Sequence, residues 1–579
     1  SNAADALGKM RFHLVSGQEV ADRELPLEIR ISALKEGRVL VVEDTGVGMT
    51  RQELMDNLGT IAHSGTQAFL RQMQEAGGAQ ERNELIGRFG VGFYASFMVA
   101  REVRVMTRSW RPGEPACLWS SAGDNQYVIE ETGDRERGTR IELHLKEGED
   151  EFLDPSRIEE VLRRHSRFVP FPLVVEGKPL EQVDAIWTRP RQEVTDEDRT
   201  AFYRSLGGGG DEPLSHLQVS SDAPLPFSAL LFLPTFNPEN LGFGKMDPGV
   251  DLYSRKVMIQ KGSKALLPEY LRFVRGVVDA EDLPLNVSRE TVQRDVRLET
   301  LKRFLTKKVL EHLAGLKKDD PERYETFWTS FQRFVREGVV SDFDNREKLA
   351  GLLRFRSLRN GREQWVDLDA YLAGMKEGQK AIYYVTGMDL DTLQANPALE
   401  VFRRRDWDVL TLTDPLDEVV IDHLRTYREL PFESAEGADL KLDEPEGEAE
   451  GREKPEGMDG FLEYLKTVLG ESVAEVRVSE RLTDSPCMLV TPKDGPSMQM
   501  EKVLKMVQKD YRYAPRVLEV NAGHPLIGEM IRIHRQKPDS GELRRMALLL
   551  RDGQWLREGI LDRVDEIIPR LQELMLAAA

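Results

Sequence analysis

Three short motifs that contain glycine follow one another in the first quarter of the chain. They are residues 44–49 (Asp-Thr-Gly-Val-Gly-Met), residues 87–93 (Gly-Arg-Phe-Gly-Val-Gly-Phe) and the pair Gly138-Thr139. An ionised carboxylate only accepts hydrogen bonds, so Asp44 can receive one from the exocyclic amine of a base such as adenine. The two glycines after it let the chain turn tightly and leave room for a flat ring. Alone, this first motif is more typical of a plain turn.

The second motif is typical of a phosphate site. Gly87, Gly90 and Gly92 precede an apolar segment, residues 93–99, for which we expect a helix. A glycine-rich start of a helix exposes N–H groups and the positive end of the helix dipole, which both suit phosphates. A flexible loop before a core helix is the alternative. The three motifs in this order favour a site for ATP, and the chain contains no GxxxxGK[ST] sequence, so it is not a P-loop site.

The segment between Gly59 and Gly92 is predicted to be a lid over this site. It contains Gly65, Gly77 and Gly78 in addition to the glycines at its two ends. Glycine at both ends of a loop allows the loop to open and close over a ligand.

Residues 2–16 are predicted to form an amphipathic helix. Its apolar stripe consists of Ala3, Ala6, Leu7, Met10 and Leu14. Asn2, Asp5 and Lys9 share a second, polar face. Because a side-chain amide oxygen is a hard ligand that suits phosphate-bound Mg²⁺, Asn2 is a candidate metal ligand.

Strands must position these motifs. Residues 38–43 form a short, almost entirely apolar segment and should be a buried strand. Residues 103–108 and 141–145 alternate between apolar and polar side chains, as half-exposed strands do. Helices combined with such strands predict a two-layer α/β domain whose sheet is covered on one face, ending near Val175.

The rest of the chain divides by composition into further regions. A second αβ region is expected over residues 184–432, with a helix over 292–316. Residues 433–456 carry ten acidic and three basic side chains and should form a solvated loop or linker. Residues 457–579 end in amphipathic helices, which could make dimer contacts or pack in an ordinary core. Their apolar positions are Leu543, Met546, Leu550, Val564, Ile567, Ile568, Leu571 and Leu574.

Composition excludes several classes of protein. The 579 residues suggest about three or four domains, and the net charge of −20 disfavours binding to nucleic acid or anionic lipid. No run of about 18 apolar residues occurs, so we expect no membrane span. Cys117 and Cys487 are the only cysteines, which argues against a disulfide framework or a zinc site and fits a reducing cytosol.

Together, Asn2, the three motifs and longer strings in the chain resemble the 90-kDa heat-shock chaperone family. Asn2 and the three glycine motifs resemble the four sequence motifs of the Bergerat ATP-binding fold. Type II topoisomerases, mismatch-repair ATPases and histidine kinases share this fold. The strings at 57–66, 86–94, 186–189, 283–290 and 524–527 narrow the resemblance to the chaperone. The chain has no Met-Glu-Glu-Val-Asp ending and no long charged linker between its first two domains, so it is most similar to the bacterial HtpG type.

The resemblance implies an α+β multidomain fold. An N-terminal two-layer α/β sandwich would bind ATP (residues 1–178), and an αβα middle domain would follow (184–432). The acidic loop or linker (433–456) would precede a small α/β domain for dimerisation (457–579). The implied protein is a cytoplasmic, stress-related ATPase that opens and closes as a homodimer, binds partly folded clients and works with the 70-kDa heat-shock chaperone system.

The resemblance also assigns residues to the nucleotide. Asp44 would bind the adenine amine, with Gly48, Met49 and Thr139 around the base, and Asn2 would ligate Mg²⁺ beside Asp5. Asn57 would contact ribose and phosphate. Phosphate contacts would come from the lid and from the second motif. These positions are His63, Ser64, Gly90, Val91, Gly92 and Phe93.

Arg289 would reach the γ-phosphate from the middle domain, with Gln293 on the same helix. A guanidinium fork stabilises the charge that builds up on a transferring phosphoryl group. Without the family, an arginine at this position is more typical of a surface ion pair.

The chain departs from the family pattern in two places. The family has a glutamate four residues before the asparagine that corresponds to Asn2, and that position precedes Ser1. General-base help contributes roughly 10²–10⁴-fold, so the chain as given should bind ATP better than it hydrolyses it. Residues 1–3 could also be a cloning scar, in which case Asn2 leaves the site. His63 stands where the family usually has lysine, which puts a phosphate contact there in doubt.

A methionine-rich stretch at residues 498–507 is the candidate client surface. Methionine is flexible and polarizable and suits surfaces that bind many partners. A helix that faces the core or a dimer partner is the alternative. For the whole chain, the alternatives are a DNA-acting ATPase of the same superfamily, which the charge argues against, and a nucleotide-gated binding protein without hydrolysis. A histidine kinase would need a helix with a phospho-accepting histidine before the ATP domain.

Overall fold

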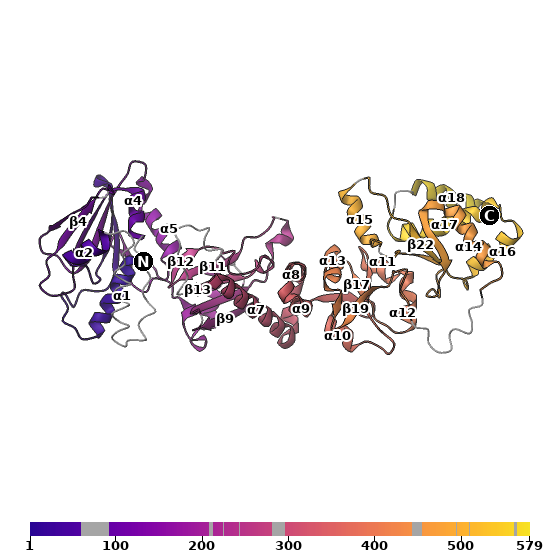
Figure 1. Ribbon diagram of the computed structural model, residues 1–579, viewed down its shortest axis with the longest axis horizontal. Coiled ribbons are helices and arrows are strands. Elements are labelled where there is room, and N and C mark those ends of the chain that lie inside the picture. Colours follow the sequence, from indigo (N-terminus) through magenta and orange to yellow (C-terminus); the bar gives the residue numbers. More distant parts are fainter. Residues whose placement is uncertain are drawn as a thin grey trace. The chain divides into compact units, whose positions relative to one another are not determined.

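The computed structural model (Figure 1) describes residues 1–59, 92–124, 126–207, 212–223, 225–242, 244–280, 296–442, 454–493, 495–508, 510–560 and 564–578. The chain forms two compact units, residues 1–309 and 310–579. Over the described residues, each unit contains two sheets. The finer domain boundaries that the sequence suggests stay a prediction.

The first sheet has eight strands in the order β5-β4-β3-β6-β2-β1-β7-β8. Their bounds, in that order, are Val128–Glu131, Cys117–Ser121, Ala100–Arg108, Gly138–Leu145, Val39–Asp44, Ile29–Leu34, Leu173–Val175 and Lys178–Pro179. Neighbouring strands are antiparallel except β1 and β7, which are parallel. The helices beside this sheet are α1 (Asn2–Val15), α2 (Arg51–Leu58), α4 (Ser96–Val99) and α5 (Pro155–His165).

One face of this sheet carries the apolar side chains and is covered by helices. Strand registers place Val42, Ile141 and Val105 in one cross-strand row on that face. Ala4 and Leu7 of α1 pack against the β1 end of the face, and Leu54 and Leu58 of α2 pack against the β3–β4 end. The two-layer arrangement expected from the alternating strands is therefore confirmed.

Three expectations for this domain need correction. Asp44 is the last residue of β2 and does not follow the strand, because its backbone pairs with Thr139 of β6. The helix expected over 93–99 is a 3₁₀ turn at Gly92–Ala95 followed by α4. The first helix ends one residue earlier than expected, at Val15.

The second sheet of the first unit has the order β12-β11-β13-β10-β9. The bounds are Val257–Gln260, Gly249–Ser254, Arg275–Ala280, Phe227–Leu233 and Ser215–Ser221. An aromatic core holds helix α6 (Asp196–Ser205) on this sheet, with Phe202 near Trp187, Phe168 and Phe232. Helix α7 (Val296–Asp319) follows and agrees with the expected helix over its described part.

The second unit begins with a six-stranded sheet of order β15-β14-β17-β16-β19-β18. The bounds are Gly361–Asp367, Arg354–Ser357, Leu410–Leu412, Ile382–Thr386, Leu430–Ser434 and Thr426–Tyr427. Its helices are α8 (Pro321–Ser341), α9 (Arg346–Ala350), α10 (Leu368–Ala373), α11 (Leu390–Gln394), α12 (Glu400–Arg404) and α13 (Pro415–Leu424).

The start of the expected acidic linker belongs to this sheet, which corrects part of the 433–456 prediction. Residues 433 and 434 end β19, Ala435 is fully buried, and Gly437 forms a bridge to Thr491. Composition alone does not reveal this part of the sheet. A short apolar stretch and backbone pairing hold the segment there despite its acidic side chains. Residues 443–453 lie outside the described residues.

The last sheet has three strands, β20 (Val473–Val478), β22 (Arg516–Val520) and β21 (Cys487–Val490). Around it lie α14 (Met458–Leu469), α15 (Met498–Val507), α16 (Pro525–Gln536), α17 (Gly541–Arg557) and α18 (Val564–Ala578). Leu543 and Leu550 of α17 are in the core, so these positions are ordinary packing. The mixed α/β fold class expected from the sequence is confirmed. None of the described helices has the length and apolar content needed to cross a membrane.

Candidate nucleotide-binding site

A polar row interrupts the apolar face of the eight-stranded sheet. Asp44 of β2 pairs with Thr139 of β6, and Thr139 pairs with Thr107 of β3. Directly paired residues point to the same face, so the three side chains stand side by side. The two threonine hydroxyls lie 3.1 Å apart, and Thr107 Oγ1 donates to the carbonyl of Gly138 at 3.0 Å. The same hydroxyl accepts the N–H of Met49 at 2.9 Å, which ties the first motif to this row.

Asp44 is the charged member of the row. Its side chain is buried, with the residue 7% exposed, and its Oδ1 accepts the N–H of Gly46 at 2.9 Å. Burial raises the pKa of Asp44 to about 7, and the Gly46 N–H and the positive charge of Arg135 oppose this shift. When the pKa of a buried carboxylate is near 7, a further hydrogen-bond donor, such as the amine of a base, stabilises its ionised form.

Two glycines of the motifs are required by close backbone contacts. Gly48 has φ +56°, and a Cβ there would come within 1.8 Å of the carbonyl oxygen of Arg108. Gly138 has φ +118°, and a Cβ there would lie 2.1 Å from the carbonyl oxygen of Asp44. Any side chain at either position would push the first motif away from β3 and β6.

Helix α1 lies against the first motif. The N–H of Val47 donates to the carbonyl of Ala6 at 3.2 Å, and a Cβ on Gly46 would meet Ala6 at 2.6 Å. Asn2 is exposed in the first turn of this helix, whereas Asp5 is 2% exposed. The polar face expected for α1 is therefore partly inside the protein, on the side that meets the motif.

Asn57 and Phe93 come from segments outside the polar row. Asn57 is half-buried near the end of α2, and the hydroxyl of Tyr94 donates to the carbonyl of Leu58 at 3.0 Å. The ring of Phe93 packs against Trp119 with centroids 5.6 Å apart and joins the core cluster of Leu54. Phe93 can therefore offer a ligand its backbone but not its ring.

Several predicted site residues lie outside the described residues. These are His63, Ser64, Gly90, Val91, Arg289 and Gln293, together with most of the expected lid. Gly92 is described as the first residue of the turn that leads into α4.

Sequence reasoning missed Arg137, the residue before Gly138-Thr139. Its side chain is 1% exposed and donates to the carbonyl of Thr45 and, at 2.9 Å, to that of Leu25. Its own N–H donates to Asp22 at 2.8 Å. The only available signal was its position beside a motif, since a charged residue next to glycine is otherwise typical of an exposed turn.

The buried carboxylate, the glycine contacts and the covered sheet define a nucleotide-binding domain of the ATPase class. Residues 2–130 match the family model described as histidine kinase-, DNA gyrase B- and HSP90-like ATPase. Residues 173–578 match the model of the Hsp90 protein family.

Full-length relatives agree with both matches. The chain is 40% identical to the chaperone protein HtpG of Desulfitobacterium hafniense, over 99% of this chain and 93% of the relative. It is 41% identical to the HtpG of Oleidesulfovibrio alaskensis, over 99% and 92%, and 41% identical to that of Chlorobaculum tepidum, over 100% and 93%. The chain belongs to the Hsp90 family of ATP-dependent chaperones, and the DNA-acting alternative is not favoured.

Proposed function

We propose that this chaperone binds partly folded proteins and cycles between open and closed homodimers as it binds and hydrolyses ATP in the cytoplasm. The observation that carries the nucleotide part is the row of Asp44, Thr139 and Thr107. It combines a buried acceptor with backbone that leaves no room for side chains at Gly48 and Gly138. A flat base with one exocyclic amine fits both features.

The roles proposed for single residues follow from this placement and from the resemblance. Asp44 accepts from the adenine amine, Gly48, Met49 and Thr139 surround the base, and Asn57 faces ribose and phosphate. The Gly90–Phe93 backbone, His63 and Ser64 serve the phosphates, and Arg289 with Gln293 stabilises the transferring group. These last roles rest on the resemblance alone.

Mg²⁺ is proposed to be held mainly by the phosphates, with Asn2 as a protein ligand near Asp5. Among the described residues, no cluster of three or more His, Cys, Asp or Glu could hold a metal ion. Mg²⁺ bound to ATP commonly uses one or two protein ligands, and Asn2 would supply one of them.

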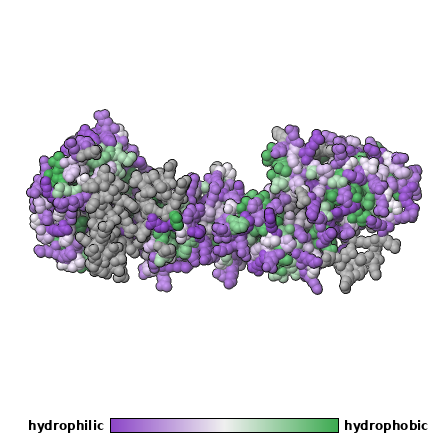
Figure 2. Space-filling model, viewed as in Figure 1, coloured by the Kyte–Doolittle hydropathy of each residue, from purple (hydrophilic) through white to green (hydrophobic). Residues whose placement is uncertain are grey.

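Two helices of the second unit support the proposed client and dimer surfaces. Met506 and Val507 of α15 are 70% and 77% exposed, and Figure 2 shows apolar atoms where Figure 1 places this helix. Ile568 and Leu571 of α18 are each 48% exposed. We assign α15 to client binding and α18 to the contact between two copies. Cooperation with the 70-kDa chaperone system is a further proposal that rests on the resemblance.

The test of the nucleotide site is the substitution Asp44→Asn in the full chain. It should weaken ATP binding by on the order of 100-fold, because an amide replaces a charged acceptor in a buried position. Calorimetric titration with ATP, with and without Mg²⁺, measures the change. Removal of Mg²⁺ should weaken the binding of ATP and leave the binding of adenosine unchanged.

The matched control is Glu43→Gln. Glu43 is the neighbouring carboxylate on β2, on the opposite face of the strand, and its loss should change the affinity by less than about twofold. Equal affinity of Asp44→Asn and Glu43→Gln for ATP would refute the proposed site. Turnover recorded in the same samples tests the expectation that this chain hydrolyses ATP slowly.

A further inference from the structure

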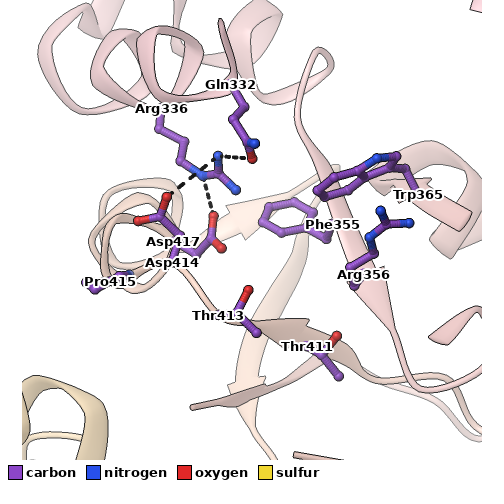
Figure 3. Close-up of a pocket in the computed structure, with 10 residues that line it drawn as sticks. All are labelled: Gln332, Arg336, Phe355, Arg356, Trp365, Thr411, Thr413, Asp414, Pro415 and Asp417. Carbon is purple, nitrogen blue, oxygen red and sulfur yellow. Dashed lines mark hydrogen bonds and ion pairs between the residues drawn. The ribbon is translucent and has the colours of Figure 1, made fainter. Parts of the chain in front are cut away.

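A cavity lies in the unit of residues 310–579, and it shares no residue with the proposed nucleotide site. It has a volume of about 440 Å³ and is lined by residues of α8, β14, β15, β17 and α13 (Figure 3). The cavity therefore lies between one face of the six-stranded sheet and two helices that cover it. Its volume is in the range of small-molecule sites.

On the helix side of this cavity, the polar groups have partners within the chain. Arg336 of α8 donates to Asp417 of α13 at 2.5 Å and to Gln332 at 2.7 Å, and its guanidinium is 4.0 Å from Asp414. Its guanidinium also lies over the ring of Trp328, at 5.2 Å. Both aspartates that line the cavity are thus close to one buried arginine.

On the sheet side, two buried polar atoms have no hydrogen-bond partner among the described residues. Arg356 of β14 and Thr411 of β17 are directly paired, so both side chains emerge on the same face. Over the described residues, Arg356 Nη1 and Thr411 Oγ1 are buried without a hydrogen-bond partner, and Thr411 is only 3% exposed. In Figure 3 the dashed lines connect Arg336 with its partners, and none reaches Arg356 or Thr411.

The aromatic wall of the cavity holds Arg356 in place. The guanidinium of Arg356 stacks on Trp365 of β15, 3.8 Å from the ring centroid, and Phe355 lines the cavity beside it. Burial lowers the pKa of Arg356, and the charge of Glu325 opposes this shift. No ion pair with Arg356 occurs within the described parts of the chain, and Glu325 lies 4.0 Å from Arg354.

We propose that this cavity binds a small carboxylate with an apolar body, with its carboxylate on Arg356 and Thr411 and its body against Trp365 and Phe355. A guanidinium fork matches a carboxylate, and a neighbouring hydroxyl adds one further donor. The source of the carboxylate is either a free small molecule or the C-terminus of a polypeptide. Both present the same chemistry to the two donors.

The test uses N-acetyl-phenylalanine as the probe and its amide as the neutral counterpart. Titrations of the full chain by ligand-observed NMR should give millimolar binding of the acid and at least tenfold weaker binding of the amide. A longer peptide ending in phenylalanine then distinguishes the sources. If the peptide binds as well as N-acetyl-phenylalanine, the natural ligand is the C-terminus of a polypeptide. If the peptide does not bind, the natural ligand is a free small molecule.

Three variants locate the probe. Arg356→Met keeps an apolar side chain on Trp365 but removes the fork, and should weaken binding of the acid at least tenfold. Thr411→Val has the same shape without the hydroxyl and should weaken it several-fold. Arg354→Met is the matched control, because Arg354 lies on the same strand but stacks over Tyr324 and does not line the cavity; it should bind the acid normally.

Several results would overturn the proposal. They are equal binding of acid and amide, unchanged binding by Arg356→Met, or no binding of the acid to the unmodified chain at tens of millimolar. Thermal unfolding of each variant checks the fold. Thr411→Val replaces a hydroxyl without a partner by a methyl group and is expected to melt no earlier than the unmodified chain, so it keeps the test decisive if Arg356→Met misfolds.

Discussion

The proposed nucleotide site centres on a carboxylate that the fold has taken out of water. Burial raises the pKa of Asp44 to about 7, against an ordinary value of 3.8. The carboxyl group is therefore partly protonated at neutral pH in the unliganded chain. An amine that donates to Asp44 favours the ionised form, so nucleotide binding and proton release should be linked.

This linkage predicts that affinity for adenosine falls as the pH falls. With a pKa of about 7, the ionised fraction of Asp44 drops about tenfold between pH 8 and pH 6, so the dissociation constant should rise by up to about tenfold. Adenosine is the suitable ligand because it lacks phosphates that titrate in this range. Calorimetry in two buffers of different ionisation enthalpy counts the protons released.

Glu43→Gln should keep this pH dependence with its midpoint at lower pH, because the charge of Glu43 raises the pKa of Asp44. A pH-independent affinity for adenosine in the unmodified chain would contradict the assignment of the base to Asp44.

At the scale of elements, the site depends on the pairing of β2 with β6 and on the anchor that holds the loop between β2 and α2. Arg137 precedes β6 and donates to carbonyl groups of Thr45 and Leu25 from a fully buried position. One side chain therefore joins the end of β2, the segment before β1 and the start of β6.

Arg137→Met is expected to destabilise the N-terminal domain by about 2–5 kcal/mol, because it leaves buried carbonyl groups without donors. Nucleotide binding should weaken as the loop after Asp44 loses its anchor. Hydrogen exchange of residues 44–49, together with thermal unfolding, measures both effects.

Arg137→Lys should recover part of the stability, since an ammonium group can reach one of the carbonyls. Arg140→Met is the control, because Arg140 lies three residues further along, in β6, and forms a partly exposed ion pair with Glu142. If Arg140→Met and Arg137→Met cost the same stability, Arg137 is not an anchor.

At the scale of the whole molecule, helix α18 exposes an apolar face to solvent in the single chain. Ile567 is buried, whereas Met575 and Leu576 are 65% and 78% exposed. A helix with apolar residues on a second face usually meets another surface. A second copy of the chain is the partner that we propose for it.

The substitution Leu571→Glu on this face should shift the chain from dimer to monomer at micromolar concentration. A buried, unpaired charge at an interface commonly costs 2 kcal/mol or more, which is roughly a 30-fold weaker dimer. Analytical ultracentrifugation measures the shift. Glu573→Gln on the same helix is a control that should stay dimeric, and a monomer in the unmodified chain would refute this interface.

The sequence by itself determined the class of site and the elements that carry it. Asp44 stands out because it ends an apolar strand, and Gly48 and Gly138 stand out as glycines in short motifs. Helix α1 and strand β3 follow from spacing alone, since the period of apolar residues reports local geometry. These features depend on near neighbours in the chain, which a sequence displays directly.

Only the tertiary structure decided which of these residues meet. Long-range register sets Asp44 beside Thr139 and Thr107, buries Asp5, and turns Arg137 from a turn residue into a buried anchor. It also opened a cavity at Arg356 and Thr411, which no motif marks, and drew residues 433 and 434 into a sheet. Burial and pairing between distant segments are properties of the folded chain, so local patterns do not contain them.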